Sequence, residues 1–92
     1  MYRTEHDLVG EKQIDREAYY GIHSLRAAEN FPITNQRVPD DMIMSMAWIK
    51  KACARANRMA GVLPEYIADA IEHACDDLIV GKLHDQFIVD PL

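Results

Sequence analysis

The sequence lacks the features that mark nucleic-acid-binding, secreted or membrane-spanning proteins. Lys and Arg number 10 against 15 Asp and Glu, giving a formal net charge of −5, so the basic surface that binds phosphate backbones is missing. Apolar runs reach only four residues, far below the roughly 20 needed to cross a bilayer. The first residues, 1–7, contain no apolar signal core. We expect a soluble, cytoplasmic chain that binds neither nucleic acid nor membranes.

Cysteine is also scarce. The only two are Cys53 and Cys75, and no Cys or His spacing is typical of a metal site. A reducing compartment disfavours a disulfide, and both residues lie inside apolar helical patterns. We therefore expect two free cysteines that pack as small hydrophobic side chains; a disulfide or a reactive thiol is the less favoured interpretation.

What is present is the composition of a globular protein. Of the 92 residues, 49% are hydrophobic and 27% are charged, which argues against disorder. The length suits one domain spanning residues 1–92. A chain this short buries only about 60–65% of its unfolded surface, so its stability is marginal without help.

The first third of the chain predicts a short β-hairpin followed by a helix. Residues 2–14 alternate weakly around Gly10, which supplies the turn. Asp15 has the character of an N-cap, and apolar residues recur at helical spacing from residue 18 to residue 28. Gly21 then lies inside this helix, where glycine usually means a kink or a close backbone approach. The helix should end before Pro32.

Two further helices follow a polar loop over residues 34–39. The second opens after Pro39 and stops at Gly61, and the third runs from Pro64 to Gly81. The main apolar face predicted for the second helix is formed by Met42, Met46, Ile49, Cys53, Ala56 and Ala60, and Ile43, Ala47 and Ala54 widen it. The fold class is thus mainly α, with about three helices and a short N-terminal hairpin.

Two interpretations of this pattern remain open. The second helix carries a longer apolar stripe than the rest of the chain can cover, and the mixed tail over residues 82–92 ends in mid-pattern. Both features indicate that the chain is one part of a larger protein. Alternatively, the hairpin and helices close unaided into a small domain.

Few residues suggest chemistry. His73 has carboxylates three and four positions later, and His84 adjoins Asp85, so a carboxylate could orient either imidazole; surface roles are the more common outcome for such pairs. Arg26 offers a planar fork suited to a carboxylate, although a pair with Glu29 or a cap on a neighbouring segment is the favoured interpretation. No nucleophile–base pair or phosphate loop occurs, and the residues alone assign no reaction.

Three segments resemble the amino-terminal part of bacterial aspartate ammonia-lyases. Residues 18–34 read AYYGIHSLRAAENFPIT, residues 49–57 read IKKACARAN, and residues 81–92 read GKLHDQFIVDPL. All three are similar to family segments in the same order and at matching distances. Class II fumarases of the same superfamily differ at Tyr20-Gly21, Leu25-Arg26 and the run His84 to Phe87, which makes them the poorer match.

The resemblance implies the N-terminal domain of a longer lyase whose central helical bundle and C-terminal domain are absent here. Such enzymes are tetramers that reversibly eliminate ammonia from L-aspartate to give fumarate. None of the recognised catalytic residues of the family has a position in this chain, so none is carried over, and the chain alone should be inactive. We expect no resident cofactor, and these 92 residues form no recognisable metal site, although divalent cations activate some members of the family that the chain resembles.

For the rim of the substrate site we nominate Arg26 and His23, because their charge suits a dicarboxylate and because both lie on the helix that Gly21 is expected to interrupt. Two alternatives stay open beside the aspartate ammonia-lyase interpretation. One is a stand-alone helical interaction module derived from the lyase. The other is a class II fumarase-type lyase domain.

Overall fold

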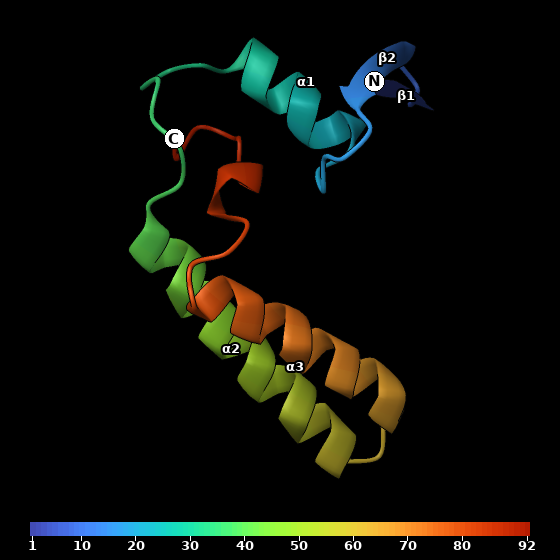
Figure 1. Cartoon of the computed structure of the whole chain (residues 1–92), viewed down its shortest axis with the longest axis vertical. Helices are drawn as coiled ribbons and strands as arrows, with labels where there is room; N and C mark the ends of the chain where they lie inside the picture. The colour runs from blue at the N-terminus through green and yellow to red at the C-terminus, as the bar shows by residue number, and fades with distance from the viewer. The chain divides into compact units, whose positions relative to one another are not determined.

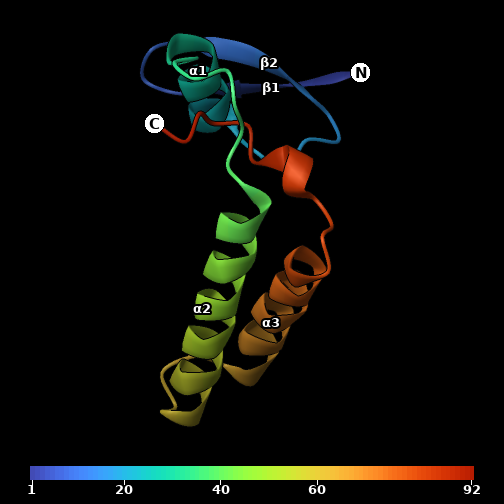
Figure 2. The same ribbon diagram turned by 90° about the vertical axis from the view of Figure 1, so that its left-hand side faces the viewer.

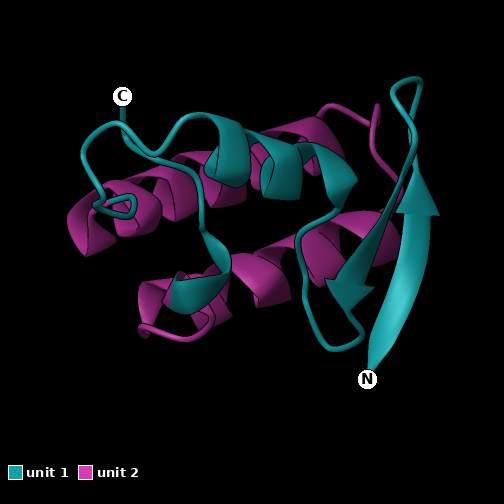
Figure 3. Ribbon diagram, turned by 90° about the horizontal axis from the view of Figure 1, so that it is seen from above, with its two compact units in different colours: residues 1–38, 85–92 teal, residues 39–84 magenta.

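The structure is a computed structural model that describes residues 1–92 and contains two strands, three α-helices and one short 3-10 turn (Figure 1). Its internal packing defines two compact units, residues 1–38 with 85–92 and residues 39–84 (Figure 3). A mainly α fold with a short N-terminal hairpin confirms the predicted fold class. The single domain over residues 1–92 remains a prediction. No helix has the length and apolar character required to cross a membrane.

The first unit begins with the predicted hairpin. Strands β1 (Tyr2–His6) and β2 (Glu11–Asp15) pair antiparallel, with Tyr2 opposite Asp15. Gly10 lies in the connecting turn with a φ of +153°, which glycine adopts readily. Alternate residues of β2 turn inward, and Ile14 is only 1% exposed. Ile14 therefore anchors the hairpin in the core of its unit.

Helix α1 (Ile22–Asn30) starts later than the sequence suggests. The prediction that Asp15 caps this helix and that Gly21 lies inside it is wrong. Gly21 precedes the helix in an extended conformation, and Asp15 ends β2. The cause is a long-range contact, because the Arg3 side chain binds several backbone carbonyls between residues 15 and 20. Those carbonyls accept hydrogen bonds from Arg3, and residues 16–20 form no helix. The predicted end before Pro32 is confirmed.

The second unit is an antiparallel helical hairpin. Helix α2 (Asp40–Met59) and helix α3 (Glu65–Ile79) lie side by side in both views (Figures 1 and 2). Gly61 and Gly81 follow the two helices with φ values of +77° and +95°. At each end the N–H of the glycine and that of the next residue bond back to the last turn, so both glycines terminate their helices as predicted. Pro64 lies just before α3 rather than at its first position.

The buried face of α2 differs from the predicted main stripe. Ile43, Ala47 and Ala54 are buried, whereas Met42, Met46 and Ile49 are 56%, 48% and 55% exposed. Small side chains fill the contact with α3, where Ala68 is fully buried, because they let two helices approach closely. Met42, Met46 and Ile49 of the predicted main stripe therefore remain largely exposed.

The two cysteines also differ in burial. Both are free, as predicted, but only Cys75 is buried. Cys53 lies on the exposed stripe of α2, so the prediction that both pack as buried hydrophobic side chains holds for Cys75 alone.

Candidate functional site

The two nominated rim residues lie together on α1, beside the hairpin turn. The Arg26 Nε donates to Asp7 Oδ2 at 2.8 Å, and the Nδ1 of His23 lies 4.0 Å from the same oxygen. The His23 side chain is 88% exposed, whereas the side chains of Arg26 and Asp7 are 22% and 8% exposed. Arg26 therefore pairs with Asp7 rather than with Glu29, which contacts Lys12.

Asp7 is the centre of this cluster. Its Oδ1 also accepts the backbone N–H of Val9 and of Gly10, at 2.9 and 3.1 Å. Burial acts to raise the pKa of Asp7, but the Arg26 guanidinium and the two backbone donors outweigh it and hold that pKa below its ordinary value. The ionised carboxylate thereby fastens the hairpin turn to α1, and it leaves the exposed His23 ring beside the pair.

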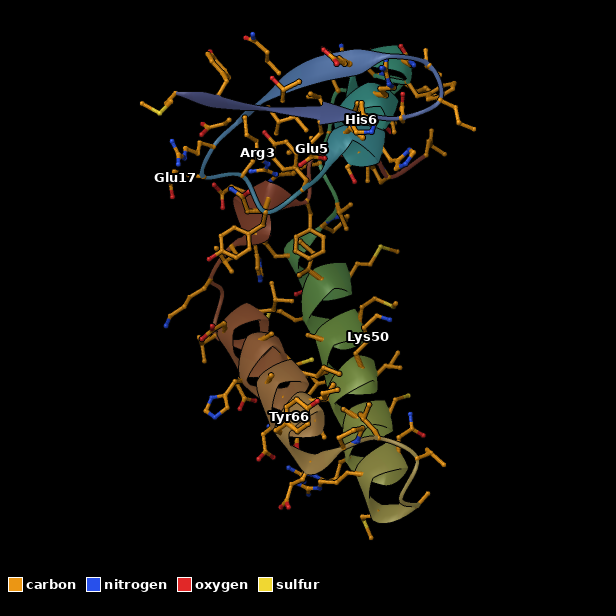
Figure 4. The ribbon with its side chains drawn as sticks, turned by 90° about the vertical axis from the view of Figure 1, so that its right-hand side faces the viewer. Arg3, Glu5, His6, Glu17, Lys50 and Tyr66 are labelled. Carbon is orange, nitrogen blue, oxygen red and sulfur yellow. The ribbon has the colours of Figure 1, made fainter.

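A second cluster shapes the segment that leads into α1. Arg3 and Glu5 lie on the same side of β1 (Figure 4), and the Arg3 Nε donates to Glu5 Oε2 at 2.8 Å. The Arg3 fork also donates to the carbonyls of Asp15, Arg16, Ala18 and Tyr20, at distances from 2.8 to 3.1 Å. One guanidinium thus fixes the irregular course of residues 15–20.

Glu5 completes the arrangement by capping α1. Its Oε1 accepts the backbone N–H of Ile22 at 3.0 Å, one of the donors that a helix start leaves unpaired. A Cβ at position 21 would lie 3.1 Å from this oxygen, so Gly21 leaves room for the cap. The hydrogen bond from Arg3 is the largest cause that holds the pKa of Glu5 below its ordinary value, and the Ile22 N–H adds to it.

The sequence analysis did not predict this Arg3–Glu5 ion pair. A signal was available, because residues two apart on a predicted strand face the same side. The backbone groups that the pair binds could not be predicted, since they lie 12 to 17 residues away along the chain.

The C-terminal segment closes the first unit. The Gln86 Oε1 accepts the N–H of Tyr19 at 2.8 Å, and Asp90 accepts both the N–H and the hydroxyl of Thr34. These bonds tie residues 86–90 to the segments on both sides of α1. A cavity of about 260 Å³ lies beside Asp90, and its lining residues are Ala28, Pro32, Asn35, Gln36, Arg37, Ile88 and Asp90.

His73 and His84, the two histidines of the second unit, occupy different surroundings. His73 is exposed on α3, whereas His84 is buried and its Nδ1 lies 3.0 Å from Asp40 rather than beside Asp85. No group of three or more His, Cys, Asp or Glu side chains is arranged to hold a metal ion. The fixed carboxylates and arginines described above belong to the first unit, and they bind segments on both sides of α1.

Comparison with known proteins places this framework in a family. A protein family described as Lyase matches residues 10–92. The chain belongs to this lyase family. Known lyases are similar to nearly the whole chain. Aspartate ammonia-lyase of Bacillus subtilis (strain 168) is 53% identical over 91 residues, which cover 99% of this chain and 19% of the relative. The enzyme of the same name from Escherichia coli (strain K12) is 44% identical, covering 96% of this chain and 19% of the relative.

Solved lyase structures share the fold as well. The fumarate lyase:delta crystallin from Brucella melitensis bound to cobalt aligns with a TM-score of 0.86 and 43% identity, covering 98% of this chain and 20% of that one. The class II fumarase from Schistosoma mansoni aligns with a TM-score of 0.85 but only 27% identity, covering 97% of this chain and 19% of that one. This chain therefore spans about one fifth of the length of its lyase relatives.

Proposed function

We propose that this chain is the N-terminal part of an aspartate ammonia-lyase, and that the complete protein eliminates ammonia from L-aspartate to give fumarate. The observation that carries the proposal is the 53% identity to the Bacillus subtilis enzyme across 99% of the chain. The fold alone does not choose a substrate, because the class II fumarase has nearly the same fold at 27% identity.

In the proposed reaction a base removes a proton from the carbon next to the side-chain carboxylate. The carbon–nitrogen bond then breaks, and ammonia leaves with the electron pair. Fixed hydrogen-bond donors that stabilise the charge on the carboxylate typically contribute about 3–4 kcal/mol each. The recognised catalytic residues of the family have no position in this chain, so its contribution is to fold and hold part of the surrounding framework.

The direct test is a substrate assay on the complete protein that carries this chain. We expect fumarate to form from L-aspartate, followed by its ultraviolet absorbance, with little or none from L-malate. The 92-residue chain serves as the matched control and should form none from either substrate. Turnover of malate without aspartate would assign a fumarase instead, and turnover of neither would favour an interaction module. Assays with added magnesium and with a chelator show whether a divalent cation activates the enzyme.

We also propose that Arg26 and His23 lie at the rim of the substrate site in the complete enzyme. The support is a cation and an exposed imidazole held side by side on α1. Arg26 already binds Asp7, so an anchoring role has to be separated from substrate contact. Arg26→Gln should lower kcat/KM for aspartate by about tenfold or more if the guanidinium also binds substrate.

Asp7→Asn is the matched control for that variant. It weakens the same ion pair but leaves the guanidinium in place, so a substrate contact by Arg26 would survive it. Equal kinetic losses in the two variants would show that Arg26 only anchors the hairpin turn. His23→Gln tests the second residue, and unchanged KM and kcat would remove His23 from the rim.

Assembly as a homotetramer is the last part of the proposal. Its support is the row of large apolar side chains that α2 leaves exposed, Met42, Met46 and Ile49, since exposed apolar patches commonly mark interaction surfaces. Light scattering of the complete protein during size-exclusion chromatography should give four times the mass of its chain. A monomer mass across the working concentration range would refute this part.

A further inference from the structure

The His84 ring lies buried between the start of α2 and the end of α3. The residue is 7% exposed. Its Nε2 lies 2.8 Å from the carbonyl oxygen of Leu78, and its Nδ1 lies 3.0 Å from Oδ1 of Asp40, the first residue of α2. All three residues belong to the unit formed by residues 39–84. Both ring nitrogens therefore face hydrogen-bond acceptors.

This geometry selects the protonated ring. A neutral imidazole has one N–H donor and one acceptor nitrogen, so it can satisfy only one of two acceptors. An ionised carboxylate has no proton to donate, and neither has a carbonyl. An imidazolium donates from both nitrogens, and the partial negative charge at the C-terminal end of α3 favours it further. The Leu78 carbonyl also accepts the N–H of Gly81 at 3.1 Å, which uses its other lone pair.

The backbone before the ring is held in a conformation that needs support. Leu83 has a φ of +64°, in the left-handed region that non-glycine residues rarely adopt. It directly follows the helix-terminating turn and directs the chain back so that residue 84 reaches α3. A contact that fastens His84 to both helices compensates for this unfavourable conformation.

We propose that His84 is a proton-dependent latch: as an imidazolium it joins Asp40 at the start of α2 to the Leu78 carbonyl at the end of α3, and loss of one ring proton releases one of the two contacts. From α2 the ring is faced by the Asp40 carboxylate, and from α3 by the Leu78 carbonyl. Nearby charges along the chain are Asp85 and Lys82, the latter 3.6 Å from an oxygen of Asp77.

The sign of the pH dependence follows from the partners. The latch stabilises the end of α3 while the ring carries its second proton, and this contribution is lost as pH rises through the pKa of the folded ring. The N–H groups of Val80, Gly81 and Lys82 bond back into the last turn of α3. They therefore report the release as faster hydrogen exchange.

The experiment is hydrogen exchange with mass spectrometry on the complete protein, corrected for the intrinsic pH dependence of exchange. Peptides covering residues 79–84 should lose about tenfold in protection between about pH 5.5 and pH 8.5, the range in which histidine titrates. His84→Gln should give weak protection that does not vary with pH. His73→Gln is the matched control, because it changes an exposed histidine of α3, and it should behave as the unsubstituted protein.

Asp40→Asn separates the latch from a general effect on folding. The Asn amide can donate to the neutral ring, so protection at high pH should be retained and the pH dependence should disappear. Asp40 is 58% exposed in its side chain, so the substitution leaves the packing of α2 intact. The latch is refuted if protection of residues 79–84 is flat with pH in the unsubstituted protein, or if Asp40→Asn keeps the full pH dependence.

Discussion

The sharpest structural prediction concerns Ile14, the most deeply buried of the large side chains at 1% exposure. Ile14→Ala removes three carbon atoms from the core of the first unit, a transfer loss of about 2.4 kcal/mol at about 0.8 kcal/mol per carbon. The unfilled cavity adds to it, so the total should fall in the range of about 2–5 kcal/mol. Ile14→Val removes one carbon and should cost about 0.5–1.5 kcal/mol.

Hydrogen exchange of the β1–β2 amides in the 92-residue chain measures this loss locally. A cost of about 2 kcal/mol corresponds to exchange about 30-fold faster. Leu8→Ala is the matched control, because it also removes three carbons but from a fully exposed position in the hairpin turn, and it should change nothing. Equal effects of Leu8→Ala and Ile14→Ala, or a larger effect of Ile14→Val than of Ile14→Ala, would refute the assignment of Ile14 as the anchor of the hairpin.

Three further predictions follow from other contacts. Because the pKa of Asp7 lies below its ordinary value of 3.8, its stabilising contribution is present above that value and is lost as pH falls through the lower folded pKa; acid titration of chain stability should show this loss, and Arg26→Gln should reduce it. Cys53 should react rapidly with a thiol reagent in the folded chain, whereas Cys75, which is buried and whose pKa is raised by burial, should react only after denaturation; rapid labelling of both would contradict the packing of α3. Glu72 contacts two arginines of α2, so Glu72→Gln should lower the free energy of unfolding of the chain by about 1 kcal/mol, and by less at high salt. A loss that does not depend on salt would contradict an electrostatic cause.

The sequence predicted the helical hairpin well because its signals are local. Pro39, Gly61, Pro64 and Gly81 delimit α2 and α3 almost to the residue, and each acts through its own backbone. The start of α1 was wrong because a distant residue decides it. Arg3 binds the backbone before the helix and Glu5 binds the N–H of its first residue, Ile22; local propensity near Asp15 does not reveal partners 12 or more residues away.

The buried face of α2 was wrong for a related reason. Periodicity identifies which residues share a face, but it does not identify which face meets the neighbouring helix. The contact with α3 uses Ala47 and Ala54, whereas Met46 and Ile49 stay exposed. The candidate site shows the same limit, because the charge of Arg26 was evident but its partner Asp7 became visible only in three dimensions.

We propose that the complete protein carrying this chain is an aspartate ammonia-lyase. The most direct test is the initial rate of fumarate formation from L-aspartate, compared with the rate from L-malate in the same preparation. We expect rapid release of fumarate and ammonia in equal amounts from aspartate, with little or no fumarate from malate. Fumarate from malate without ammonia release from aspartate would contradict it.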